Sequence, residues 1–250
     1  RYEFVTGVQT CALPILGDLD SAKRLVAAGA NVQDADAWGI SATALAAHAG
    51  YTALVEFLLE QGADPNTSGG GFTALHAAVS RRDERMVAAL LAHKADPNAR
   101  VESWTPTRRS SRDWNFNPEL VGATPYWLAA RAMAPAIMRM LANAGADTRL
   151  IHHADYHAGD PPEPRSQHTT PIMAAVGMGG GVPWVTVDRS QREPLVLEAV
   201  TLAVELGADV NVANADGRTA LDAARQARYE SVVAFLTARG AKPGTPTGRS

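Results

Sequence analysis

Residues 71–98, GFTALHAAVSRRDERMVAALLAHKADPN, decide the fold of this 250-residue chain. Their first half places small alanines after Thr73, whose hydroxyl is suited to cap the N-terminus of a helix. Their second half spaces apolar residues three and four positions apart, as in an amphipathic helix. The closing Asp-Pro-Asn is typical of a turn, because proline blocks helix continuation and Asn and Asp bond the local backbone. The stretch therefore predicts a helix-turn-helix unit that ends in a second turn.

The closing phrase recurs along the chain, and its copies Asp64 and Asp96 lie 32 positions apart. Each copy follows a leucine-rich segment with helical spacing. Most copies carry a glycine, which takes the left-handed cap conformation without a Cβ clash. Complete or partial copies stand at residues 29–31, 61–66, 94–98, 144–147, 206–211 and 240–242. One helical phrase repeated at a nearly fixed period predicts a repeat array.

A second phrase opens each unit and places a Thr or Ser where it can cap the first helix of the pair. Its copies stand at residues 39–47, 71–78, 122–130, 170–175 and 217–224. A proline follows the threonine in two copies, at Pro125 and Pro171, and proline suits the first position of a helix. The alanines that come next predict a first helix packed closely against its neighbours.

Together these phrases resemble the ankyrin-repeat pattern, G-x-T-P-L-H-x-A-A, a leucine-rich helix and then G-A-D-x-N. The resemblance runs from Leu16 to Lys242, and the chain is similar to a bacterial, insertion-bearing subfamily. It implies an all-α ankyrin-repeat α-solenoid of about five to six helix-turn-helix modules, with finger loops, long insertions and one concave face. The implied modules are about 16–35, 36–67, 68–99, 100–150, 151–213 and 214–242.

The chain also departs from that pattern. The family's histidine occurs only as His76, and other residues replace it at Ala44, Trp127, Met173 and Asp222. The hydrogen bonds that this histidine makes between finger loops are therefore expected to be largely absent, and Trp127 is expected to be packed. Residues 100–121 and roughly 177–193 are interpreted as insertions, and residues 150–169 as a long loop in place of a finger.

The two ends of the chain need separate treatment. Residues 5–15, VTGVQTCALPI, resemble the in-frame translation of a common sequencing adapter, so residues 1–15 are expected to be an unstructured artefact. The single cysteine, Cys11, falls in this segment, so no disulfide or cysteine ligand is expected in the natural part. The natural N-terminus is then missing, which leaves the localisation open. Residues 243–250 are expected to form a disordered tail.

Composition narrows the classes of partner. The formal charge of −3 and the pI near 6.2 argue against nucleic acid or an anionic membrane as the main partner. No apolar run reaches about 18 residues, so no bilayer-spanning segment is predicted. Arginine far outnumbers lysine and alanine is abundant, which indicates a GC-rich bacterial genome. A monomer that binds a protein partner is expected.

Three patterns are candidates for catalytic or ligand sites. The strongest is the polar stretch with His152, His153, Asp155 and His157, with Asp160 and His168 nearby, since imidazole and carboxylate suit a divalent metal. No second ligand cluster supports a metal, and a plain polar loop is preferred. The glycines at 177–181 lack the strand, the helix and the Gly-Lys-Ser/Thr ending of a phosphate loop, which favours a flexible insertion. No Gly-x-Ser-x-Gly elbow occurs. The chain is therefore expected to be no enzyme and to hold no metal or cofactor.

Large aromatic and arginine side chains in the loops indicate where a partner binds, because Trp and Arg are enriched at binding hot spots. The predicted contact residues are Trp38, Trp104, Arg108, Arg109, Trp114 and Phe116. Trp184 lies in the insertion at 177–193 and shares this position in a loop. The alternative is that the insertions fold back and bury their aromatic rings against the solenoid.

The resemblance implies a protein-protein interaction scaffold that binds its partner through the concave face and the finger loops. An alternative keeps the same fold but makes it the regulatory or targeting part of a larger, truncated enzyme or effector. A third hypothesis, metal-dependent hydrolysis at the histidine stretch, belongs to another class and is tested by metal analysis.

Overall fold

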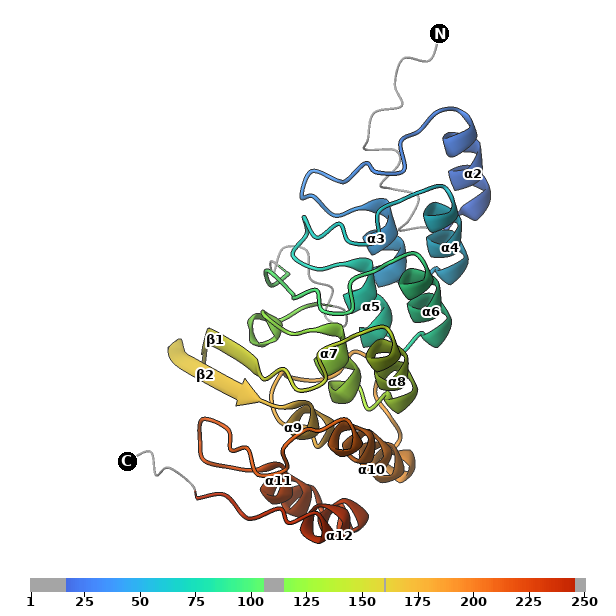
Figure 1. Ribbon diagram of the computed structural model, residues 1–250. Coiled ribbons are helices and arrows are strands. Elements are labelled where there is room, and N and C mark those ends of the chain that lie inside the picture. Colours follow the sequence, from blue (N-terminus) through green and yellow to red (C-terminus); the bar gives the residue numbers. More distant parts are fainter. Residues whose placement is uncertain (1–16, 106–114, 160, 246–250) are drawn as a thin grey trace.

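The computed structural model describes residues 17–105, 115–159 and 161–245, and within them the helices stack in pairs along one elongated array (Figure 1). The helices are α2 (Leu19–Ala27), α3 (Ala42–Ala49), α4 (Thr52–Glu60), α5 (Ala74–Ser80), α6 (Glu84–Ala92), the 3-10 helix η1 (Pro118–Leu120), α7 (Pro125–Arg131), α8 (Pro135–Asn143), α9 (Pro171–Ala175), α10 (Arg189–Glu205), α11 (Ala220–Ala227) and α12 (Glu230–Ala238). Because every one of these helices except α10 has nine residues or fewer, the hydrophobic contact between layers rather than helix propensity holds the stack together.

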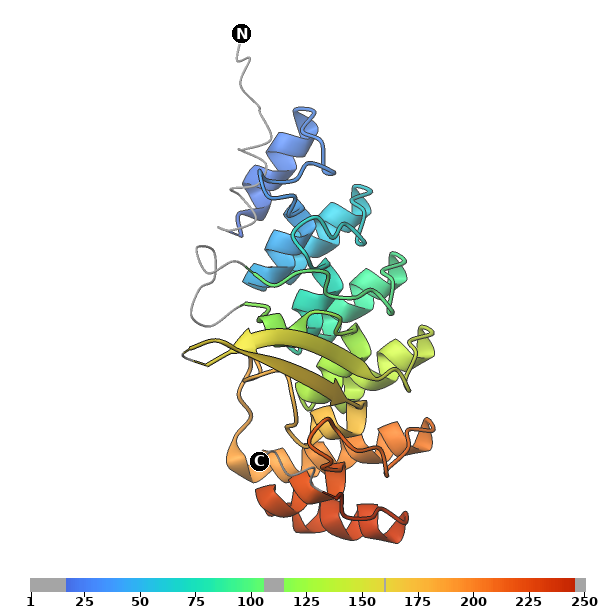
Figure 2. The ribbon, with the colours of Figure 1, turned by 90° about the vertical axis from the view of Figure 1, so that its left-hand side faces the viewer.

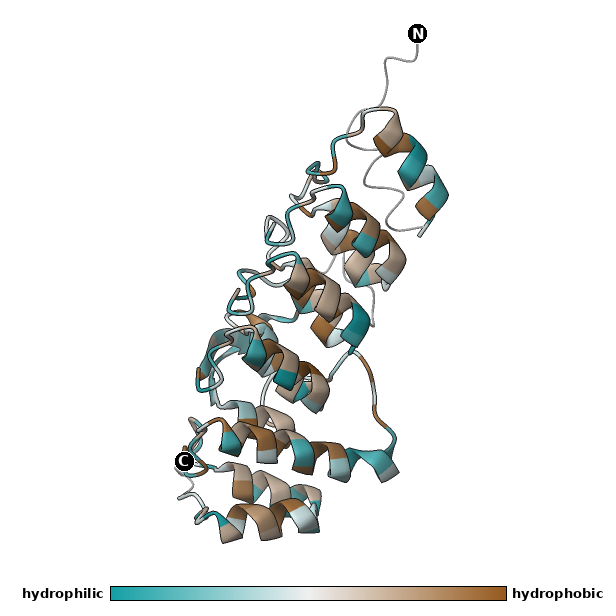
Figure 3. Ribbon diagram, turned by 45° about the vertical axis from the view of Figure 1, so that its right-hand side comes forward, coloured by the Kyte–Doolittle hydropathy of each residue, from teal (hydrophilic) through white to brown (hydrophobic). Residues whose placement is uncertain are grey.

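The helices form two parallel rows. The inner row runs α3, α5, α7, α9, α11, each packed on the next, and the outer row runs α2, α4, α6, α8, α10, α12. Buried alanines such as Ala46 and Ala77 let the inner helices approach closely, while Leu90 and Leu141 fill the space under the outer row. Each fully buried leucine of this kind contributes about 1.5–3 kcal/mol. The predicted helical solenoid is confirmed. Hydrophobic residues lie mainly in the helices, whereas the loops along one edge are mostly hydrophilic (Figure 3).

The turns between modules are joined by a ladder of side-chain amides. Each amide donates to a backbone carbonyl of the next turn and accepts from the N–H two residues further on. The four bridging residues are Gln33 (to Gly62 and Asp64), Asn66 (to Lys94 and Asp96), Asn98 (to Gly145 and Asp147) and Asn211 (to Gly240 and Lys242), at 2.6–3.3 Å. Arg149 stands at the corresponding place before α9, and there the ladder is interrupted.

The family's histidine position keeps more hydrogen bonds than the sequence predicted. The His76 Nε2 atom lies 3.1 Å from the Ala99 carbonyl oxygen. The indole Nε1 of Trp127 donates to the Thr169 carbonyl at 3.2 Å, and the Asp222 carboxylate accepts from the Gly244 amide at 2.8 Å. The prediction that these links are largely absent is therefore wrong, because Trp and Asp replace the imidazole with other donor and acceptor groups.

Residues 150–169, predicted to be a loop, fold mostly into a β-hairpin. Strand β1 (His152–Ala158) pairs antiparallel with β2 (Glu163–Thr169), and the register places His152 opposite Thr169. Viewed from the finger side, the hairpin crosses the face of the array (Figure 2). The polar composition concealed the strands, because one face of the ribbon is open to solvent and the buried face contributes few apolar residues.

Two other boundaries differ from the sequence interpretation. Helix α10 begins at Arg189, inside the stretch assigned to the insertion at 177–193, and its hydrophilic first turns project beyond the neighbouring helices (Figure 3). The segment 243–245, predicted to be part of the disordered tail, lies against α11, where Gly244 bonds to Asp222. No helix in the described ranges is both long and apolar enough to cross a membrane.

Candidate functional site

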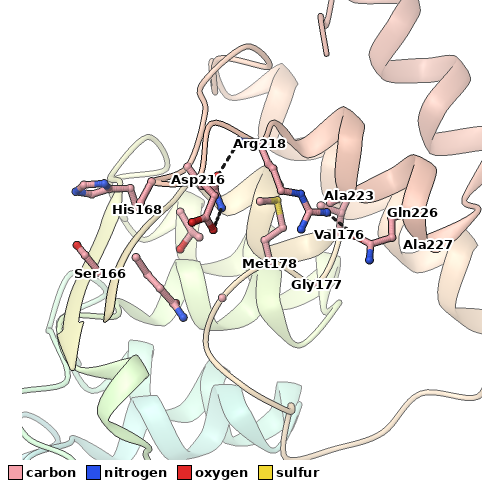
Figure 4. Close-up of a pocket in the computed structure, with 15 residues that line it drawn as sticks. Ser166, His168, Val176, Gly177, Met178, Asp216, Arg218, Ala223, Gln226 and Ala227 are labelled. Carbon is pink, nitrogen blue, oxygen red and sulfur yellow. Dashed lines mark hydrogen bonds between the residues drawn. The ribbon is translucent and has the colours of Figure 1, made fainter. Parts of the chain in front are cut away.

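A cleft opens between the hairpin and the finger loop that precedes α11 (Figure 4). Its volume of about 460 Å³ lies within the range of ligand-binding sites. Residues 166–169 of β2 form one side, and the finger residues Asn214, Ala215, Asp216 and Arg218 form the other. Residues 176–179 and the α11 side chains of Ala223, Gln226 and Ala227 complete the lining. We call this site the hairpin cleft.

The hairpin is held in place at its base by Trp127 of α7. The ring of Trp127 lies 4.4 Å from that of His152, centroid to centroid, and both side chains are buried. The Trp127 indole also bonds to Thr169, the cross-strand partner of His152, so a single side chain fixes both strands. His152 Nε2 bonds to the Glu119 carbonyl at 2.9 Å, and burial lowers the pKa of this imidazole, which favours the neutral form.

The glycine-rich loop at 177–181 passes directly over Trp127. A Cβ atom on Gly180 would lie 2.7 Å from the Cη2 atom of Trp127, and the φ of +67° favours glycine at this position. Arg131 donates from Nε to the Gly179 carbonyl at 2.6 Å, and the Gly180 amide donates to the side chain of Gln167 at 3.3 Å. The loop, predicted to be a flexible insertion, is therefore docked. A phosphate would also have to displace Gln167 from the Gly180 amide.

The opposite side of the cleft is fixed by its own turn chemistry. The Asn214 side-chain oxygen accepts from the amides of Asp216 at 3.1 Å and Arg218 at 2.8 Å. This Asx-type turn helps to fix the conformation of the finger. The Arg218 guanidinium donates to the Gln226 side-chain oxygen, which ties the finger to α11. Both sides of the cleft are thus preorganised, with the cation of Arg218 between them.

A second exposed surface lies near the other end of the array. Trp38 and Trp104 are 55% and 44% exposed and belong to the first and third finger loops. The glycine-rich second finger lies between them. A Cβ on Gly39 would lie 3.0 Å from the Gly69 backbone, and the Glu102 amide donates to the Gly71 carbonyl at 2.8 Å. The fingers therefore stack in contact, and Trp38 and Trp104 belong to one continuous edge of stacked finger loops. We call this edge the tryptophan edge.

Comparison with known proteins agrees with this geometry. A family model described as "Ankyrin repeats (3 copies)" matches residues 10–101. An ankyrin repeat domain from Acinetobacter baumannii AYE superposes with a TM-score of 0.66 at 21% identity, over 95% of this chain and 100% of that one. The ankyrin repeat domain of Bcl-3, an IkappaB family member, superposes with a TM-score of 0.59 at 20% identity, over 93% and 86%. The chain carries ankyrin repeats and has their fold.

A curated relative supports the same assignment at the level of sequence. An ankyrin repeat-containing protein of Treponema pallidum (strain Nichols) is 41% identical over 83 residues, which cover 32% of this chain and 28% of the relative. The match therefore spans little more than a quarter of that protein. Treponema and Acinetobacter are bacteria, in agreement with the predicted bacterial origin. Ankyrin repeats are in general protein-protein interaction modules and are typically not enzymes.

The structure corrects one predicted contact residue of this chain. Phe116 is fully buried, so the prediction that it contacts a partner is wrong. Its ring lies 4.8 Å from that of Phe72 and 4.8 Å from that of Trp184, and Trp184 donates from Nε1 to the Asn115 carbonyl at 2.8 Å. The two insertions thus fold back onto each other and share one aromatic cluster, which is the alternative that the sequence left open. Trp127, predicted to be packed, is buried.

The remaining predicted residues divide by location. Arg108, Arg109 and Trp114 lie outside the described residues. Trp38 and Trp104 lie on the tryptophan edge and are not brought to the hairpin cleft. Sequence reasoning considered His168 and the glycines at 177 and 179 for other roles and did not predict the cleft. The available signal was the unusual length of the segment between α8 and α9.

The histidine stretch is divided between the two faces of the hairpin. His152 points into the core beside Trp127, whereas His153 and His168 form a cross-strand pair with ring centroids 4.3 Å apart. Within residues 17–105, 115–159 and 161–245, no group of three or more His, Cys, Asp or Glu side chains is arranged to hold a metal ion.

Proposed function

We propose that this protein binds a protein partner through its concave face and finger loops. The observation that carries the proposal is the tryptophan edge, where two large indoles stay exposed although the framework leucines and alanines are buried. Tryptophan is the residue type most enriched at binding hot spots, and exposed apolar groups in stacked loops are typical of a partner-binding surface.

The buried framework of the array is separate from the exposed finger residues that would contact a partner. The alanines of the inner helices and the leucines of the outer helices are buried between modules, and the amide ladder fixes the spacing of the turns. Substituting an exposed finger residue such as Trp38 or Trp104 is therefore expected to change the surface and to leave the stack intact. An array of this kind presents a long rigid face whose loop side chains choose the partner.

Site-specific photo-crosslinking tests the proposal. A benzophenone amino acid is placed in turn at Trp38, at Trp104 and, as the matched control, at Arg139, which is exposed on the outer helix α8. In lysate of a source bacterium, irradiation is expected to give one discrete protein adduct from positions 38 and 104 but not from 139. Equal labelling at all three positions, or adducts from 139 alone, would contradict the proposal.

An alanine double variant measures how much the two tryptophans contribute to the binding free energy. Trp38→Ala with Trp104→Ala is expected to weaken capture of the crosslinked partner by about thirtyfold or more, since hot-spot side chains are often worth 2 kcal/mol or more. Val182→Ala, on the highly exposed loop before α10, is the control and is expected to leave capture unchanged. A double variant that keeps both its melting temperature and its capture would remove the tryptophan edge from the site.

Two further parts of the hypothesis rest on the sequence. Arg108, Arg109 and Trp114 are proposed to extend the tryptophan edge, because they share one loop with Trp104. The alternative, a regulatory or targeting part of a larger enzyme or effector, is tested by recovering the full-length gene. A catalytic domain in the same reading frame would favour it.

A further inference from the structure

Strand β2 has a free edge where it lines the hairpin cleft. In the part of the chain that the structure describes, the sheet contains only β1 and β2, and η1 packs against β1. In a two-stranded ribbon, alternate N–H and C=O groups of each strand point away from the partner strand. Among the described residues, the backbone of residues 163–168 makes no hydrogen bond outside the hairpin. The edge that faces the cleft therefore offers unpaired donors and acceptors in a regular row.

The outer half of this edge, residues 163–165, is protected against pairing with another strand, and the inner half, residues 166–169, is not. Pro164 has no N–H to offer, and the charged pair Glu163 and Arg165 is exposed beside it, two devices that discourage pairing between sheet edges. Residues 166–169 carry neither device, and they are the residues that line the cleft. Because the Thr169 carbonyl already accepts from Trp127, residues 166–168 present roughly 10 Å of pairable backbone at about 3.3 Å per residue.

The inner half is also rigid. Trp127 bonds to the Thr169 carbonyl, and the Gln167 side chain bonds both to Tyr156 and to the amide of Gly180. A strand that is already ordered loses little entropy when a second strand pairs with it. The finger at 214–218 stands opposite, so an added strand would lie between two fixed sides.

We infer that the hairpin cleft binds an extended peptide segment of a partner protein, which adds a third strand to the free edge of β2. The inference rests on the proposed interaction function and names the form that the partner takes at this second surface. Only another extended backbone matches a row of alternating N–H and C=O groups at strand spacing. A second folded copy of this chain fits less well, because Pro164 and the opposite finger leave only the short inner segment open.

The lining of the cleft specifies the side chains of that peptide. Successive residues of the added strand point alternately to the two faces of the sheet. Val176 and Met178 offer apolar surface to one set of side chains. Arg218 is half-buried, and its guanidinium bonds to the neutral amide of Gln226 rather than to a carboxylate. The peptide therefore carries an acidic residue that reaches Arg218, next to an apolar one.

The experiment begins with the full chain and a phage-displayed library of random twelve-residue peptides. Selected peptides are expected to contain an acidic and an apolar residue at a fixed spacing, and to bind Arg218→Glu at least tenfold more weakly. Arg139→Glu on α8 is the matched control with the same change of charge and is expected to bind as the parent does. Both variants are compared with the parent by thermal melting, so loss of fold is separated from loss of binding.

Backbone pairing is then tested on the best peptide. N-methylation of single amides is expected to weaken binding at least tenfold at every second position and little at the positions between. Amide hydrogen exchange of the protein should slow within residues 166–169. Tolerance of N-methylation at every position overturns the inference, and so does protection of the tryptophan edge alone. The second result would leave the proposed interaction function standing. A concentration-dependent dimer protected at β2 also overturns it, in favour of pairing between copies.

Discussion

The glycine-rich loop over Trp127 gives the sharpest test of the structure. In Gly180→Ala, the new Cβ lies 2.7 Å from Trp127 Cη2 and 2.9 Å from Leu120 Cδ2, and both side chains are buried. Overpacking of this kind costs about 1–3 kcal/mol, and a left-handed backbone costs a non-glycine residue about 1–2 kcal/mol. The free energy of unfolding is therefore expected to fall by roughly 2–5 kcal/mol.

Gly177→Ala is the matched control in the same loop. Its φ is +92°, and a Cβ there meets nothing within 4 Å, so it carries the backbone cost of about 1–2 kcal/mol without the clash. Urea unfolding followed by circular dichroism compares the two variants. In a domain of this size each kcal/mol also lowers the melting temperature by about 2–4 °C. Equal midpoints for the two variants would mean that the loop does not lie on Trp127.

Three other expectations concern the framework. Leu90→Ala in α6 removes a fully buried side chain and is expected to lower the free energy of unfolding by about 2–5 kcal/mol, and an unchanged urea midpoint would contradict the assigned core. Arg149→Asn is expected to restore the two missing hydrogen bonds of the amide ladder and to raise the free energy of unfolding by about 1–3 kcal/mol. Arg149→Ala cannot form these bonds and is expected to give no such increase. Burial lowers the pKa of His76 to about 4, so the folded state binds fewer protons than the unfolded chain between about pH 4 and 6.5. Stability should therefore fall as the pH drops through that window, by at most about 1.4 kcal/mol per pH unit for this group, and His76→Gln should lose that part of the slope.

The expected loss of stability in acid has a second origin besides the burial of His76, namely the hydrogen bonds of its two ring nitrogens. The Nδ1 atom accepts from the Thr73 amide at 3.0 Å, and the Ala99 carbonyl oxygen 3.1 Å from Nε2 requires a proton there. The neutral ring therefore makes both hydrogen bonds, one as an acceptor through Nδ1 and one as a donor through Nε2. Protonation would place a second N–H against the Thr73 amide and remove one of the two hydrogen bonds of the capping box at the start of α5.

The repeat array could be predicted from the sequence because its signals are local and repeated. Thr124 and Thr170 cap α7 and α9 as expected, and the glycines at 62, 145, 207 and 240 take positive φ angles near the ends of the helices. Each of these features depends on residues a few positions apart. Several copies in phase confirmed one another, so the helix pairs were predicted correctly.

The hairpin and the aromatic cluster depend on contacts between distant segments, which no local pattern records. β1 and β2 are stabilised by Trp127, which is 42 positions before Thr169. Phe116 is buried by Trp184, which belongs to a different insertion. Before the partner segment is known, an aromatic residue in a loop looks the same whether it binds another protein or another part of the chain. That ambiguity explains why Phe116 was assigned to the surface.

Four of the departures from the repeat lie near one another. Trp127 replaces the family's histidine, Arg149 replaces the bridging amide, a hairpin replaces a finger, and the glycine-rich loop crosses Trp127, all within the modules that border the hairpin cleft. Sequence rules that hold elsewhere in a protein tend to fail where function requires a different geometry. The tryptophan edge, by contrast, lies on modules where the ladder is intact. The two surfaces share no residue, so we expect a loss of binding at one to add to a loss at the other rather than to depend on it.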